Sequence, residues 1–121
     1  MNIEAALSEA MTIDGAIGAA LVDYESGMSL GSVGGGRELD LEIAAAANTE
    51  VLRAKARALE ALRIEDSIED VLITLERQYH LIRLLDRGAS RLFLYLALDR
   101  SRSNLALARH TLRNVDAHLA L

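Results

Sequence analysis

Leu39 to Leu62 reads LDLEIAAAANTEVLRAKARALEAL, and this stretch decides how the rest of the chain is organised. Placed on a helical wheel at about 100° per residue, it shows two apolar sectors side by side. The first sector contains Leu41, Ala45, Leu52, Ala56 and Leu59. The second sector contains Ile43, Ala44, Ala47, Val51, Ala54, Ala58, Ala61 and Leu62. Asn48 and Lys55 lie on the seam, and the remaining polar arc contains Glu42, Thr49, Glu50, Arg53, Arg57 and Glu60.

The apolar surface of this predicted helix is too wide for one core. A surface helix of a globular protein needs an apolar stripe only slightly wider than about 100°, and this one covers roughly twice that angle. One sector can therefore pack on the protein's own core. The other sector needs a second partner.

Composition limits the kinds of function that the chain can have. Its 121 residues predict a single domain, residues 1–121, with enough length for a core. Aromatic residues are few, so aromatic cages and base-stacking platforms are not expected. The sequence contains no cysteine, which excludes disulfides, thiolate metal sites and cysteine nucleophiles. We expect no cofactor.

Charge and hydropathy predict a cytoplasmic protein that binds neither membranes nor nucleic acids. No apolar run approaches the roughly 18 residues of a membrane span, and the start MNIEAALSEAM lacks the basic residues of a signal peptide. The formal net charge of −5 argues against general nucleic-acid binding. We interpret the arginine-rich segment 77–113 as solvated surface or as the complement of acidic residues within the same chain.

The periodicity predicts an α+β protein with the order helix, two strands, helix, three strands, helix. The expected helices span residues 3–13 and 39–62, with Asp40 as N-cap of the second, and a last helix follows candidate caps Ser101 and Ser103. The expected strands are 17–23, 28–33, 68–75, 79–85 and 91–98. The short breaks between the last three predict an antiparallel meander. Both faces of 91–98 are apolar, which predicts a central strand with helices on both sides.

None of the sequence motifs that could indicate a catalytic or metal site has the required neighbouring residues or spacing. We therefore predict that the protein is not an enzyme. Gly31 to Gly36 (GSVGGG) has phosphate-loop spacing, but Arg37 and Glu38 follow it instead of Lys and Ser/Thr, so we interpret it as a turn. His110 and His118 are about 12 Å apart along one helix, too far to share a metal ion. We interpret His80 as a surface or sheet-edge residue. The acidic cluster Glu65, Asp66, Glu69 and Asp70 lacks the EF-hand pattern and predicts a solvated turn.

Three stretches together resemble the Roadblock family of dynein-light-chain-like domains, in its bacterial branch. They are IDGAIGAALVDYESGMSLG (13–31), the helix after the glycine-rich link, and FLYLALDRSRSNLALARHTL (93–112). The first resembles the family's opening strand and tight hairpin. The last resembles its central strand and the "xNLxLAR" helix. The resemblance covers roughly residues 3–119 and rests on order and spacing, because no single motif is catalytic.

The resemblance implies the Roadblock α-β-β-α-β-β-β-α fold, with a five-stranded antiparallel sheet between helices and strand order 2-1-5-4-3. It also implies a homodimer in which the long helices pack together and the third strands pair. We predict that the dimer interface contains Ala44, Ala47, Val51, Ala54, Ala58, Val71 and Ile73. Relatives act as scaffolds or as regulators of small Ras-like GTPases. The resemblance therefore implies a homodimeric interaction module with a small GTPase or another protein as partner.

Two alternatives remain open at the level of sequence. A profilin-like or PAS-like small-molecule sensor has a similar layered form and keeps a cavity between sheet and helices. Abundant Ala and Leu with few polar core residues favour a packed interior instead. The other alternative is a purely structural adaptor that does not affect a GTPase.

Overall fold

The computed structural model describes residues 1–88 and 90–120, which form one five-stranded antiparallel sheet with helices on both faces. The helices and strands in chain order are α1 (Ile3–Ala10), β1 (Ala16–Asp23), β2 (Ser29–Gly34), α2 (Leu41–Ala61), β3 (Asp70–Thr74), β4 (Gln78–Arg87), β5 (Ser90–Asp99), the 3₁₀ turn η1 (Arg100–Arg102) and α3 (Leu105–His118). The predicted fold class and element order are confirmed.

The strands lie in the order β2-β1-β5-β4-β3, as the family resemblance implies. β5 is central, paired with β1 through Leu21↔Leu94 and with β4 through Leu81↔Leu96. Its side chains alternate between two cores. Leu92, Leu94, Leu96 and Leu98 enter one core, and Phe93, Tyr95 and Ala97 enter the other. The prediction of a central strand covered on both faces is confirmed.

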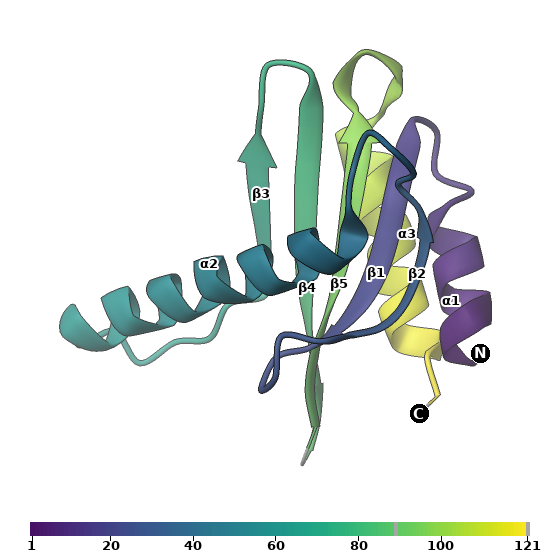
Figure 1. Cartoon of the computed structure of the whole chain (residues 1–121). Helices are drawn as coiled ribbons and strands as arrows, with labels where there is room; N and C mark the ends of the chain where they lie inside the picture. Colours follow the sequence, from purple (N-terminus) through teal and green to yellow (C-terminus); the bar gives the residue numbers. More distant parts are fainter. Residues whose placement is uncertain (89, 121) are drawn as a thin grey trace.

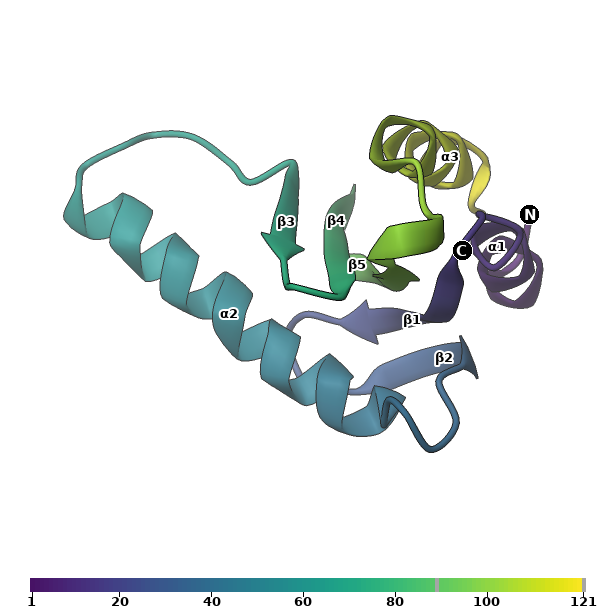
Figure 2. The same cartoon turned by 90° about the horizontal axis from the view of Figure 1, so that it is seen from above.

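The two faces of the sheet are covered differently. α1 and α3 lie side by side on one face, and α2 alone crosses the other (Figure 1). Viewed from above, α2 starts over β2 and continues past β3, so its C-terminal half projects beyond the sheet (Figure 2). Its 21 residues span about 31 Å at 1.5 Å per residue, whereas five strands at about 4.8 Å spacing span roughly 19 Å.

Side-chain caps determine where the helices begin. Asp40 caps α2 as predicted, because its carboxylate accepts hydrogen bonds from the backbone N–H groups of Glu42 and Ile43. The prediction for the last helix was wrong, since Asn104 rather than Ser101 or Ser103 caps α3. Both serines instead bond to Asp99 around η1.

The glycine-rich link between β2 and α2 is a tight backbone turn. Gly34 and Gly35 both have φ of +82°, and a Cβ atom built on Gly34 would lie 2.6 Å from the Ile17 carbonyl oxygen. A Cβ on Gly35 would lie 2.5 Å from the Leu39 carbonyl oxygen. Backbone conformation and close approach thus account for these glycines, which agrees with their interpretation as a turn.

Several boundaries differ from the predictions. α1 ends at Ala10 rather than at residue 13, because 3₁₀-type hydrogen bonds from Thr12 and Ile13 tighten the last turn before Gly15. β3 is shorter than the apolar run 68–75. Within the described part of the chain, none of the helices has the length and apolar character needed to cross a membrane.

Candidate protein-interaction surface

The side of α2 that faces away from the sheet carries an open apolar stripe, defined by Ile43, Ala46, Ala47, Val51, Ala54, Ala58, Ala61 and Leu62. Ile43 is 67% exposed, Leu62 63% and Val51 39%. They recur at helical spacing, so they lie along one side of the helix over most of its length. Large apolar side chains that follow one another along an exposed face are typical of a protein-interaction site.

The predicted interface residues occupy different positions in the structure. Ala47, Val51 and Ala54 are exposed on α2, and Ala58 is half-buried. Ala44 is buried in the core between α2 and the sheet. The large exposed residues Ile43 and Leu62 were not in the predicted interface, although the helical wheel had already placed them in the second sector.

The edge of the sheet beneath α2 is open as well. β3 is the last strand in the sheet order, so one side of its backbone has no strand partner in the part of the chain that the structure describes. Val71 and Ile73 are half-buried and lie opposite Ile82 and His80 of β4. Val71 packs with the core beneath α2. An open edge strand beside an apolar helix surface is suited to pairing with another chain.

The C-terminal half of α2 overhangs a groove of about 700 Å³. The predicted core sector fails here, since Ala56 is exposed and Leu59 is only half-buried. The physical reason is that the C-terminal half of α2 runs away from the sheet (Figure 2), so these side chains face a groove instead of packed strands. The groove is lined by Tyr24, Leu52, Ala56, Leu59, Glu60, Arg63, Ile64, Glu65, Asp66, Ser67, Ile68, Leu84, Leu85, Asp86 and Arg91.

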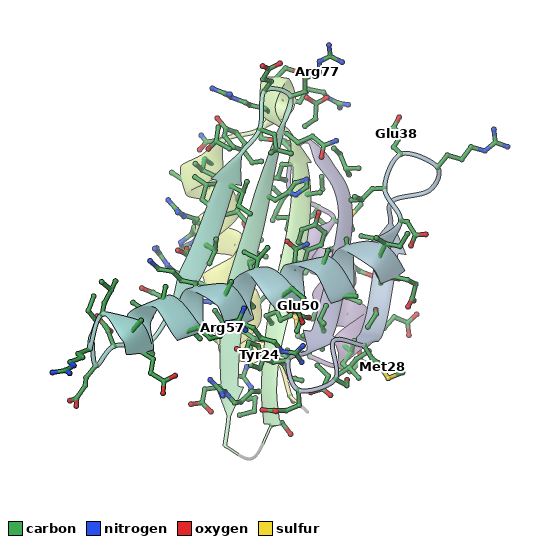
Figure 3. All side chains as sticks on the ribbon, turned by 60° about the vertical axis from the view of Figure 1, so that its left-hand side comes forward. Tyr24, Met28, Glu38, Glu50, Arg57 and Arg77 are labelled. Carbon is green, nitrogen blue, oxygen red and sulfur yellow. The ribbon has the colours of Figure 1, made fainter. Side chains whose placement is uncertain are left out.

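The side of α2 next to the β1–β2 turn is polar. Arg53 pairs with Glu50 at 2.6 Å and donates hydrogen bonds to the backbone carbonyls of Tyr24 and Glu25. In Figure 3, Glu50, Arg57 and Tyr24 lie together on this side, toward the turn that carries Met28. Arg77 lies at the other end of the strands. The helix therefore presents one polar and one apolar flank.

Thr49 does not lie where the wheel put it. It was assigned to the polar arc, yet it is buried against Gly27 and donates its hydroxyl to the Ala45 carbonyl at 2.7 Å. Asn48, which the wheel places on the seam between the two apolar sectors, is buried and donates to the Ala44 carbonyl at 2.8 Å. The β1–β2 turn covers Thr49, and this contact between distant segments cannot be read from helical periodicity.

A buried tyrosine on β5, Tyr95, has Asn48 of α2 and His80 of β4 as polar neighbours. Its hydroxyl oxygen lies 3.2 Å from Nδ1 of His80, whereas the Asn48 side chain donates to the Ala44 carbonyl. Burial raises the pKa of Tyr95 to about 12, although the neighbouring Asn48 amide acts in the opposite direction. Burial lowers the pKa of His80. The prediction of a sheet-edge position for His80 was wrong, because β4 lies between β3 and β5, and the His80 side chain is half-buried.

The arginines of β4 and α3 pair with acidic residues of the same chain. The Asp116 carboxylate of α3 accepts a hydrogen bond from Arg83 Nε at 2.9 Å and forms an ion pair with Arg87 at 3.0 Å. Arg109 of α3 lies 3.2 Å from a carboxylate oxygen of Asp70. The interpretation of segment 77–113 as an internal complement is confirmed for these residues. Their pairing clamps α3 to β3 and β4.

The remaining candidates for chemistry are spread over the molecule. His80 lies on β4, whereas His110 and His118 lie on α3. In the acidic cluster, Asp70 pairs with Arg109 and Glu69 lies 3.8 Å from Arg83. Across residues 1–88 and 90–120, no group of three His, Cys, Asp or Glu side chains is arranged to hold a metal ion.

Solved structures with the same architecture identify the fold. The chain is similar to a Roadblock/LC7 domain from Streptomyces avermitilis, with a TM-score of 0.79, 13% sequence identity and coverage of 97% of this chain and 93% of that one. It is also similar to MglB from Myxococcus xanthus, with a TM-score of 0.74, 17% identity and coverage of 93% and 84%. This is the Roadblock/LC7 fold.

A third Roadblock-type structure, the gliding protein MglB from Thermus thermophilus, has a TM-score of 0.77 and 17% identity, with coverage of 93% of this chain and 82% of that one. No protein-family sequence model matches the chain, and no curated protein matches it by sequence. The Roadblock likeness thus rests on three-dimensional structure. It agrees with the resemblance seen in the order and spacing of the sequence.

Proposed function

We propose that the protein is a homodimeric Roadblock-type interaction module, a single domain that regulates or scaffolds a small Ras-like GTPase in the bacterial cytoplasm. It carries no catalytic residues of its own in this proposal. The observation that supports it most directly is the open apolar stripe of α2, which runs beside the open edge of β3. The overhang of α2 beyond its own sheet supports the same proposal (Figure 2).

The partner of the α2 stripe, in this proposal, is the same stripe of a second copy. Alanines at positions 47, 54 and 58 permit close approach of two helices, and Ile43, Val51 and Leu62 supply the apolar bulk. Burying a Val- or Leu-sized side chain contributes about 1.5–3 kcal/mol, and a two-fold axis makes each residue count twice. Such a contact, extended by pairing of the β3 edges, is strong enough for a stable dimer.

The dimer is tested by placing charge in the stripe. Ala54→Arg or Ala47→Arg puts a guanidinium against the partner helix, so sedimentation should show monomers while circular dichroism shows a folded chain. Arg57→Ala, on the polar flank of the same helix, is the matched control and should remain dimeric. Monomeric wild-type protein in the same experiment would overturn the homodimer.

The GTPase is tested with a Ras-like GTPase encoded beside the gene for this protein. We expect the two proteins to co-purify and the rate of GTP hydrolysis to change when the Roadblock protein is added. Co-purification without a change in rate would favour the structural adaptor. Absence of both would remove the GTPase from the proposal and leave the dimer standing.

A small-molecule sensor, the alternative from another class, places its ligand between sheet and helices. The groove of about 700 Å³ lies between the C-terminal half of α2 and the sheet, where Leu84 and Leu85 of β4 and Arg91 of β5 line it, so a sensor's ligand would bind there. Native mass spectrometry of the purified protein tests this alternative, because a sensor should retain a bound ligand of defined mass.

A further inference from the structure

Polar side chains of α2, β5 and β4 lie together in the otherwise apolar layer between α2 and the sheet. Asn48 of α2 and Tyr95 of β5 are both buried, the latter with 1% of its surface exposed. Their neighbours in this layer are apolar, among them Leu52, Ile82 and Phe93. Buried polar groups are costly unless each finds a partner, so the direction of every hydrogen bond matters here.

The partners determine which atom donates in each bond. Nε2 of His80 lies 2.7 Å from Oε1 of Gln78, an oxygen that can only accept, so Nε2 carries the proton. In the neutral ring Nδ1 is then the acceptor, and the Tyr95 hydroxyl donates to it across 3.2 Å. The chain of donors therefore runs from Tyr95 through His80 to Gln78. Asn48 lies beside the phenol, and its own hydrogen bond goes to the Ala44 carbonyl.

Protonation of His80 at Nδ1 exchanges the donor and acceptor roles in its hydrogen bond with Tyr95. With a proton on Nδ1, the imidazolium points an N–H group at the phenol oxygen, and Nδ1 can no longer accept from the hydroxyl. The Tyr95 hydroxyl hydrogen then loses its acceptor in a buried site, which is unfavourable. Tyr95 and His80 are in edge-to-face contact at 5.4 Å, so neither ring can turn away without disturbing the packing beneath α2.

Of the residues that the structure describes, those around His80 provide no negative charge that would stabilise its protonated ring. Ile73 of β3 and Ala97 of β5 lie opposite it in the sheet. Tyr95 is the titratable neighbour, and Lys55, two turns after Asn48 on α2, is exposed and has the same charge as an imidazolium. Among the described residues no carboxylate lies within 4.0 Å of the ring.

We propose that His80 and Tyr95 form a proton-sensitive latch in the layer beneath α2, which keeps that layer packed near neutral pH and loosens it as the pH falls toward about 5. The latch itself depends only on contacts within one chain. Its effect on the α2 stripe, and hence on dimerisation, rests on the proposed function.

The direction of the pH dependence follows from burial. Because the pKa of His80 is lower in the folded chain than its ordinary value of 6.5, the folded state resists protonation more than the unfolded state does. The stabilisation from the neutral latch is fully present above pH 6.5. It is lost progressively as the pH falls from 6.5 to the folded-state pKa of His80.

The first experiment compares thermal unfolding of the full chain at about pH 7.5 and pH 5.5. His80→Asn retains an acceptor near the position of Nδ1 but cannot be protonated, and His110→Asn removes an exposed histidine of α3 as the matched control. We expect the unfolding midpoint of the wild type and of His110→Asn to fall by about 3–6 °C more than that of His80→Asn. Equal falls in wild type and His80→Asn would overturn the latch.

A second readout does not depend on the stability of a variant. NMR titration of the wild type should give a pKa for His80 below 6.5, and Tyr95→Phe should move it upward because the phenol no longer occupies Nδ1. An ordinary pKa for His80 in the wild type would overturn the latch. A depressed pKa that Tyr95→Phe leaves unchanged would overturn the role of Tyr95.

Sedimentation at the same two pH values tests the latch and the proposed homodimer separately. We expect the dimer dissociation constant to rise at least about threefold at the lower pH in the wild type and to stay constant in His80→Asn. A monomer at both pH values whose unfolding still depends on His80 would overturn the homodimer and support the latch. A dimer whose unfolding and dissociation are the same in both proteins would overturn the latch alone.

Discussion

The two faces of the sheet are built on different principles. The face under α1 and α3 is covered by two helices, and its buried side chains are apolar throughout, from Leu7 to Val115. The face under α2 is covered by one helix, contains the buried polar residues Asn48, Thr49 and Tyr95, and leaves an apolar stripe open to solvent.

The difference between the two faces indicates which one stabilises the fold and which one is available to bind partners. Ion pairs from Asp116 to Arg83 and Arg87 close the rim of the α3 face, so that layer is complete within one chain. The α2 layer has an apolar surface left over and a helix longer than the sheet is wide. We infer that the first face maintains the fold and that the second face meets partners.

The largest loss of stability should come from removing a buried side chain on the sheet face that α1 and α3 cover. Leu96 is fully buried on the central strand and points toward α1 and α3, so Leu96→Ala should lower the free energy of unfolding by about 3–4 kcal/mol. Chemical denaturation measures this loss. Leu107→Ala, at an exposed leucine of α3, is the control and should change it by less than about 0.5 kcal/mol. A loss below about 1 kcal/mol for Leu96→Ala would contradict the picture of a tightly packed closed layer.

A smaller loss of stability should follow when the ion pairs between α3 and β4 at the edge of that face are removed. Asp116→Ala leaves Arg83 and Arg87 without their shared carboxylate, and the Asp116 and Arg83 side chains are only 18% and 15% exposed. After allowing for solvent screening we expect a loss of about 2 kcal/mol in denaturant unfolding. Glu50→Ala removes the acidic partner of an exposed ion pair on α2 and should cost less than about 0.5 kcal/mol. If both variants lost the same free energy of unfolding, the partly buried ion pairs of Asp116 would be no more stabilising than the exposed pair of Glu50.

The smallest effect on folding should come from the open stripe. Val51→Gln replaces a partly exposed apolar residue, so at concentrations where the chain is monomeric the free energy of unfolding should change by less than about 0.5 kcal/mol. At concentrations where dimers form, the same change should weaken association. Unfolding at low and high protein concentration separates the two effects. A large loss in the monomer would mean that Val51 belongs to the chain's own core.

Local patterns in the sequence predicted most of the fold because each depends on neighbouring residues. Alternation in 91–98 identified the central strand, and Asp40 before an apolar period identified the start of α2. The cap of α3 was missed because three side chains with capping ability, at positions 101, 103 and 104, lie close together. Geometry around η1 selects Asn104.

The candidate site was predictable in part. The helical wheel found both sectors of α2, including the members Ile43 and Leu62 that the structure leaves most open. It could not show that a groove lies next to Leu59, because the path of α2 over the sheet depends on packing between distant segments. His80, Tyr95 and Asn48 are also far apart in sequence, and only strand register and helix placement bring them together.

The sequence by itself determined the order of the elements, the helical period of α2 and the excess width of its apolar surface, since these follow from side-chain spacing along one segment. The tertiary structure decided which of those side chains are covered. Burial depends on where α2 crosses the sheet, how far it overhangs β3 and which turn lies over Thr49. Packing between distant segments therefore separates the core sector from the open stripe.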